Sequence, residues 1–207
     1  MKTTILAIAT ILASSLMVPT SGYAQATDKM NPGDDLPVIA ANLRSATTSV
    51  STIKSASKEN GLLVMFSCNT CPFVIKNQPI TLKAMDYAAS HHVGMVIINS
   101  NEAQRDDADS YEAMVKYAKS QNYSVPYIVD ANSQIANAFG ANHTPEVFLF
   151  NSKNKLVYKG AMNDNPSDPA HAKQVYIEDA INAMVAGKEV NPATTKSIGC
   201  SIKRKTS

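Results

Sequence analysis

The sequence has 207 residues, of which 44% are hydrophobic and 17% are charged, and its formal net charge is +2. This length suits a single α/β domain with a sizeable buried core. A near-neutral chain carries no broad basic surface, so we expect no nucleic-acid partner.

The N-terminal segment has the layout of a secretory signal peptide. A basic start at Lys2 is followed by the apolar run Ile5–Val18 and by an Ala24-Gln25-Ala26 cleavage motif. The run is shorter than the ~20 residues that span a bilayer, which argues against a membrane anchor. We therefore expect residues 1–26 to be a signal peptide, cleaved after Ala24 or Ala26. The mature chain should be exported, periplasmic or secreted, and free of a membrane span.

Residues 27–60 are polar and predict an N-terminal arm with one or two edge strands. The candidates are the short run Val38–Ala40 and the weakly alternating segment Ser49–Ile53. The continuous apolar run Leu62–Phe66 follows a turn at Asn60-Gly61 and predicts a strand buried on both faces.

A helix is expected to begin near Pro72, because proline is tolerated in a first helical turn. Pro79 should kink or break this helix, and helical spacing resumes over Ile80–Ala89. Strands and helices then alternate up to a closing hairpin. The remaining strands are expected at residues 93–98, 126–129, 146–150 and 155–158, and the remaining helices at residues 106–119, 133–139 and 175–185.

This order of elements predicts one α/β domain over residues 61–187. Alternation of strands and helices favours a parallel sheet, to which the hairpin adds antiparallel strands. Residues 188–207 are expected to form a C-terminal tail.

The motif Cys68-Asn69-Thr70-Cys71-Pro72 comes directly after the first buried strand. A thiol reacts as its thiolate, and a helix N-terminus favours the anion, so this placement predicts a lowered pKa for Cys68. We expect Cys68 to attack a partner and Cys71 to resolve the mixed disulfide. A redox-active Cys68–Cys71 disulfide would then serve without any bound cofactor or metal.

Other uses of the C-x-x-C motif remain open. A zinc or copper site needs about four ligands. The chain offers Cys200 and four scattered histidines for this purpose, which are His91, His92, His143 and His171. A static structural disulfide is a further alternative. A c-type haem needs histidine after the second cysteine, where this chain has Pro72.

Thr144-Pro145 immediately precedes the strand expected at residues 146–150. A proline that enters a strand after a short loop is a candidate cis peptide. Beside a disulfide, such a turn would offer backbone groups to a partner strand. His143 is a candidate for proton transfer at the same site or, alternatively, a solvated loop residue.

Several segments together carry a family resemblance. They are Phe66–Pro72, Ile97–Asn101, Pro126-Tyr127, Thr144–Phe150, Tyr158–Gly160 and Ser197–Lys203. With them, the chain resembles the thioredoxin-like superfamily, and more narrowly its redoxin branch, related to alkyl-hydroperoxide-reductase and thiol-specific-antioxidant proteins. The resemblance implies a three-layer sandwich with a mixed central sheet and helices on both faces. It also implies that Cys68 and Cys71 are the redox pair and Pro145 a cis-proline. We expect Pro72, His143 and Thr144 to be neighbours of this site.

The chain departs from its relatives at two points. Thr70 stands where members of this branch often carry histidine, so the pair lacks an imidazolium beside the thiolate. The lead-in Leu63–Ser67 also lacks the P-x-x-x-[ST]-x-x-C pattern that peroxiredoxins use for peroxide.

Cys200 leaves the count of cysteines odd. It is either a tail thiol without a role or, if the tail folds back, a third redox thiol that traps Cys68 or Cys71. The function that we expect is thiol–disulfide exchange with protein disulfides or dithiols, supplied by an electron donor that the sequence leaves unnamed. The alternatives are a thiol peroxidase and a redox-inert binding or metal-handling module.

Overall fold

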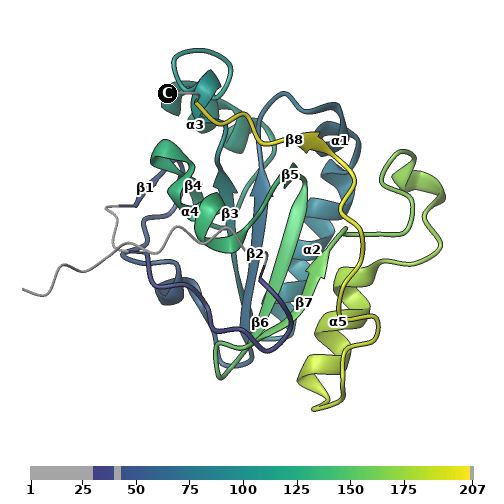
Figure 1. Cartoon of the computed structure of the whole chain (residues 1–207). Coiled ribbons are helices and arrows are strands. Elements are labelled where there is room, and N and C mark those ends of the chain that lie inside the picture. The colour runs from purple at the N-terminus through teal and green to yellow at the C-terminus, as the bar shows by residue number, and fades with distance from the viewer. Residues whose placement is uncertain (1–29, 40–42, 206–207) are drawn as a thin grey trace, which may run out of the picture.

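The computed structural model describes residues 30–39 and 43–205 (Figure 1). The expected signal peptide lies outside these residues. Within the described ranges, no helix is long and apolar enough to cross a membrane.

A mixed sheet of six strands, in the order β1-β4-β3-β2-β6-β7, forms the centre of the molecule (Figure 1). β2 runs parallel to β3, and β3 runs parallel to β4. The other neighbours in this sheet pair antiparallel. The strands are β1 (Arg44–Ser45), β2 (Gly61–Ser67), β3 (Val93–Asn99), β4 (Tyr127–Val129), β6 (Glu146–Asn151) and β7 (Leu156–Gly160). The predicted closing hairpin is therefore β6–β7.

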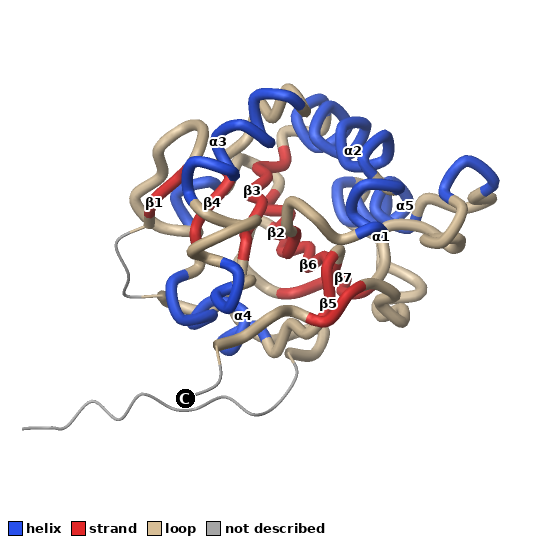
Figure 2. The backbone as a smooth tube through the Cα atoms, turned by 90° about the horizontal axis from the view of Figure 1, so that it is seen from above, coloured by secondary structure: helices blue, strands red, loops and turns tan. Residues whose placement is uncertain are grey.

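β2 lies in the middle of this sheet because every one of its side chains is apolar or small enough to be buried. Leu63 and Met65 face one side, where helices α2 (Gln78–Ser90), α3 (Tyr111–Ser120) and α5 (Tyr176–Val185) pack. Val64 and Phe66 face the other side, which α4 (Gln134–Phe139) and the N-terminal arm cover. Figure 2 shows helices on both faces of the sheet, as the predicted three-layer sandwich requires.

Two helix boundaries have clear local causes. α1 (Pro72–Lys76) ends at Asn77, and α2 follows with Pro79 in its first turn, so the predicted break occurs two residues before the proline. The helix predicted from residue 106 begins only at Tyr111, because Ser110 caps it by accepting a hydrogen bond from the Ala113 amide.

The arm and the tail differ from the prediction. The arm supplies one edge strand, β1 at Arg44–Ser45, whereas residues 49–53 form no strand, with bends at 51–53, and Val38 and Ile39 also lie outside any strand. Ala40 lies outside the described residues. The tail is not a loose end, because β8 (Cys200–Ser201) pairs antiparallel with β5 (His143–Thr144).

Candidate functional site

The cysteine motif occupies the turn between β2 and α1. β2 ends at Ser67, Cys68 follows it directly, and Cys71 is the residue immediately before α1, which begins at Pro72. Cys68 is 1% exposed and Cys71 is 4% exposed, so both sulfurs are buried. Thr70, between them, is exposed.

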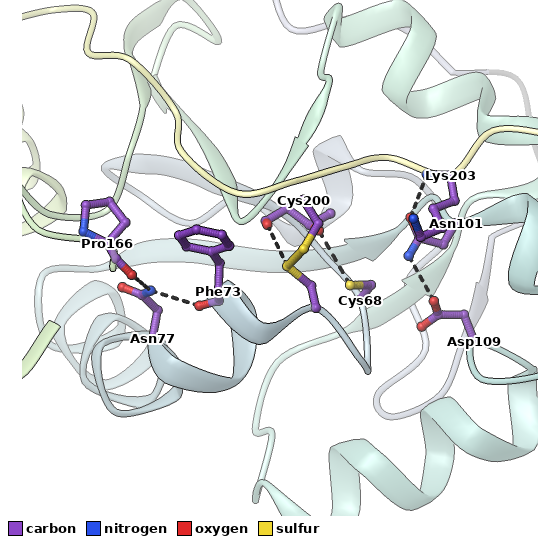
Figure 3. The surroundings of a disulfide bond; sticks show 10 residues. Cys68, Phe73, Asn77, Asn101, Asp109, Pro166, Cys200 and Lys203 are labelled. Carbon is purple, nitrogen blue, oxygen red and sulfur yellow. Dashed lines mark hydrogen bonds between the residues drawn. A yellow bond between two sulfur atoms is a disulfide. The ribbon is translucent and has the colours of Figure 1, made fainter. Parts of the chain in front are cut away.

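A disulfide joins Cys71 to Cys200, with 6.1 Å between their Cα atoms, and Cys68 is a free thiol. Figure 3 shows this bond beneath the returning tail, with Cys68 beside it. The Cys68–Cys71 disulfide expected from the sequence is therefore not the bond that this structure contains. The structure instead bears out the expectation that the tail folds back and brings Cys200 to the motif.

The loop before β6 lies against both cysteines of the motif. The Thr144–Pro145 peptide bond is cis, as the sequence predicted. The Thr144 hydroxyl lies 3.5 Å from the Cys68 sulfur, and the Thr144 carbonyl oxygen lies 3.2 Å from the Cys71 sulfur. Cys71 carries no proton while it is in the disulfide, so the second contact becomes a hydrogen bond only after reduction.

Burial raises the pKa of the Cys68 thiol, and the negative charge of Asp109 adds to the increase. Hydrogen bonding to Thr144 and to the backbone of Cys71 and Thr70 acts in the opposite direction but is weaker. The lowered pKa expected from the helix N-terminus is therefore wrong for this state of the protein. α1 has only five residues, and desolvation of a thiolate in a closed site outweighs its effect.

The segment of residues 197–205, which we call the strap, closes the site. Its strand β8 places Cys200 opposite Thr144 and Ser201 opposite His143. The Ile202 amide donates to the Asn142 carbonyl at 2.9 Å. A side chain at Gly199 would overlap the Thr144 carbonyl, so the close approach of the strap to the loop depends on glycine.

Asp109 is a buried carboxylate that the sequence did not single out. One of its oxygens accepts from the Asn69 backbone amide at 2.8 Å and from the Asn99 side chain at 2.7 Å. The other accepts from the Asn101 side chain at 2.9 Å. No local pattern marks this residue, because it stands in a stretch that resembles the start of a helix.

His143 is half-buried and directed toward the strap. Its Nδ1 lies 3.2 Å from the Ser197 hydroxyl, which also donates to Glu146 at 3.2 Å. Through its contact with Ser197, His143 helps to hold the strap. In the described part of the chain, no three His, Cys, Asp or Glu side chains gather as metal ligands would.

Residues 31–176 match the redoxin family. The chain belongs to the redoxin family. The match contains the cysteine motif and the Thr144–Pro145 loop, and it begins within the N-terminal arm. Cys200 and the strap lie beyond it.

Two solved structures share close to a third of their residues with this redoxin. An uncharacterized conserved protein from Geobacillus kaustophilus is 32% identical, with a TM-score of 0.77, over 86% of this chain and 94% of its own. A hypothetical protein from Sinorhizobium meliloti 1021 is 31% identical, with a TM-score of 0.77, over 87% of this chain and 98% of its own. None of the curated proteins compared with the chain matches it.

A more distant structure identifies the fold as thioredoxin-like: a thioredoxin-like protein in its oxidized form is 16% identical, with a TM-score of 0.57, over 76% of this chain and 97% of its own. The putative thiol:disulfide interchange protein DsbE from Chlorobium tepidum is 14% identical, with a TM-score of 0.55, over 77% of this chain and 98% of its own. At this identity the likeness concerns the fold alone.

Proposed function

We propose that this redoxin is a thiol–disulfide oxidoreductase that exchanges disulfides with partner proteins. The observation that carries the proposal is the convergence of three cysteines on one loop. Cys68 and Cys71 both contact Thr144, and Cys200 pairs with Thr144 across the β5–β8 ladder. Three sulfurs in one closed site are the parts that a disulfide relay needs.

The first step of the relay opens the strap. Cys200 is the only one of the three cysteines that is partly exposed, so a donor dithiol attacks Cys200 and releases the Cys71 thiolate. The second donor thiol then breaks the mixed disulfide. The donor leaves as a disulfide, two electrons have entered the protein, and Cys71 and Cys200 are thiols.

The second stage passes these electrons to a partner. The Cys68 thiolate attacks a partner disulfide and expels one partner thiolate. Cys71 then attacks the Cys68 sulfur, releases the second partner thiolate and forms a Cys68–Cys71 bond. Attack of Cys200 on Cys71 restores the Cys71–Cys200 disulfide and returns Cys68 to a thiol, which is the state of this structure.

Export is the second part of the proposal. The signal-peptide layout of residues 1–26 supports it, and so does a disulfide, because such bonds persist in oxidising compartments. N-terminal sequencing of the protein recovered from outside the cytoplasm should begin at Gln25 or Thr27.

The proposed chemistry is tested by mixing the reduced protein with a disulfide-bonded test protein and measuring the partner thiols released. Wild type should release two thiols per molecule, and Cys68→Ser none. Cys71→Ser should trap a mixed disulfide on Cys68, detectable by mass spectrometry. Cys200→Ser is the matched control, which should still reduce the partner but stop at the Cys68–Cys71 bond.

Two results would count against the proposal. Full activity of Cys68→Ser would show that Cys68 is not the attacking nucleophile. Stoichiometric consumption of peroxide, without reduction of the test protein, would favour the thiol peroxidase instead.

A further inference from the structure

The turn that carries Cys68 is held by hydrogen bonds to residues other than the motif cysteines. Asn69 donates its backbone amide to Asp109, and its side-chain amide donates to the Ala108 carbonyl at 2.9 Å. Its side-chain oxygen accepts from the Tyr127 hydroxyl at 2.8 Å. Three bonds therefore fix a residue directly adjacent to the proposed nucleophile.

Asp109 is unusual as the anchor of this turn because it is a fully buried carboxylate held by neutral groups. Its donors in the described part of the chain are the Asn69 backbone amide and the side chains of Asn99 and Asn101. The nearby Arg105 guanidinium donates to the carbonyl oxygens of Asn99 at 2.8 Å and of Asp109 at 2.7 Å, and its ion pair at 3.5 Å is with Glu102. The carboxylate charge is thus stabilised by dipoles, and it acts on its surroundings through a medium of low dielectric constant.

The same carboxylate also reaches the strap. Asn101 donates to Asp109 and accepts from the Lys203 amide at 2.9 Å, so it bridges the two (Figure 3). Asp109 therefore contacts the cysteine turn directly and the strap through one side chain.

We propose that Asp109 is a positioning residue for the thiol–disulfide reaction. Its carboxylate holds the Asn69 amide, and with it the turn that keeps Cys68 against Thr144. Its buried negative charge opposes ionisation of that thiol while the site is closed. This role rests on the proposed function, in which Cys68 is the attacking sulfur, and it deepens that function by naming the group that restrains the nucleophile.

The other titratable groups around Cys68 do not supply this charge. Tyr117, Tyr123 and Tyr127 also interact electrostatically with Cys68, and burial raises the pKa of each, which disfavours a negative charge on these rings. Cys71 is held in the disulfide and does not titrate. Among the residues that the structure describes, Asp109 is the carboxylate whose charge raises the pKa of Cys68.

The test is a pH titration of the Cys68 thiolate, followed by its ultraviolet absorbance in the oxidised protein, where Cys68 is the free thiol. Subtraction of the same trace from a matched Cys68→Ser variant removes the tyrosines. Asp109→Asn keeps an acceptor for Asn69 and removes the charge. It should raise the ionisation constant of Cys68 by about three- to tenfold.

Three variants separate charge from structure. Asn101→Ala removes the bridge from Asp109 to the strap but keeps the charge, so the midpoint should shift less than it does in Asp109→Asn. Asp107→Asn removes an exposed charge of the same loop and should leave the midpoint unchanged. Asp109→Glu restores the charge and should return the midpoint toward wild type, while displacement of the Asn69 amide slows the exchange reaction.

An unchanged midpoint in Asp109→Asn would overturn the proposal, and so would an equal shift in Asn101→Ala. If Asp109→Asn does not fold, a low midpoint in Asp109→Glu decides against the role of the charge. The titration is read without a partner protein. Its outcome is therefore separate from the release of partner thiols, which tests the proposed function.

Discussion

The pairing of Cys71 with Cys200 predicts a large contribution of one bond to stability. The two residues are 129 positions apart, and a bond between them restricts most of the unfolded chain. Loop-closure entropy gives about 5 kcal/mol for a loop of this length, but only about 2 kcal/mol for the loop of about four residues that a Cys68–Cys71 bond would close. The difference is large enough to identify the bond in solution.

The assay is urea unfolding followed by circular dichroism, with and without a phosphine reductant. The free energy of unfolding of wild type should fall by about 5 kcal/mol on reduction. Cys68→Ser should show the same fall, because Cys68 is outside the bond. In Cys200→Ser the fall should not exceed about 2 kcal/mol, the value for the short loop.

A small effect of reduction on wild type, matched by Cys200→Ser, would refute this reasoning. It would mean that the protein in solution contains the Cys68–Cys71 bond. Peptide mapping of the oxidised protein by mass spectrometry would then show the motif cysteines joined to each other.

Three further predictions concern the strap, the thiol and the hydrogen-bond network. Gly199→Val should displace the strap from the Thr144 carbonyl and speed hydrogen–deuterium exchange in residues 197–205 at least about tenfold, whereas Ser201→Val, at an exposed position of the same strand, should not. Because folding raises the pKa of Cys68, the protonated thiol contributes fully to the free energy of unfolding below about pH 8.5, the pKa of an unfolded thiol. This contribution is lost as the pH rises through the pKa of Cys68 in the folded protein. Urea unfolding of wild type and of Cys68→Ser across this pH range measures the loss. Tyr127→Phe should lower the free energy of unfolding by about 1–3 kcal/mol, because it leaves the buried Asn69 oxygen without this donor; a loss below about 0.5 kcal/mol in the same urea assay would contradict the inferred hold on the turn.

Much of the fold could be predicted from local sequence patterns. The run Leu62–Phe66 is apolar without interruption, and only a strand in the middle of a covered sheet can bury all of it. A proline between a short loop and a strand marked Pro145 as a cis residue. Glycine after an apolar helical segment marked the end of α4, where Gly140 adopts a positive φ.

Predictions failed where a contact joins distant parts of the chain. The edge strand of the arm forms at Arg44–Ser45, because its partner is β4, more than 80 residues away, and its own sequence has little preference for a strand. The helix predicted from residue 106 starts only after its local cap Ser110, and the residue before this cap, Asp109, accepts hydrogen bonds from Asn69, 40 residues earlier, and from Asn99 of β3.

The sequence by itself determined the fold class, the position of the cysteine motif after a buried strand, and the neighbouring proline loop, because each depends on residues close together in the chain. Tertiary structure decided which two of the three cysteines pair. Cys71 lies only three positions from Cys68 in the sequence, yet the β5–β8 ladder brings Cys200 to it across 129 residues. Burial of the Cys68 thiol, together with the charge of Asp109, also reverses the direction in which the pKa of Cys68 was expected to move. Which cysteines pair, and how deeply Cys68 is buried, depend on contacts between distant parts of the chain, so the spacing of the cysteines in the sequence does not predict them.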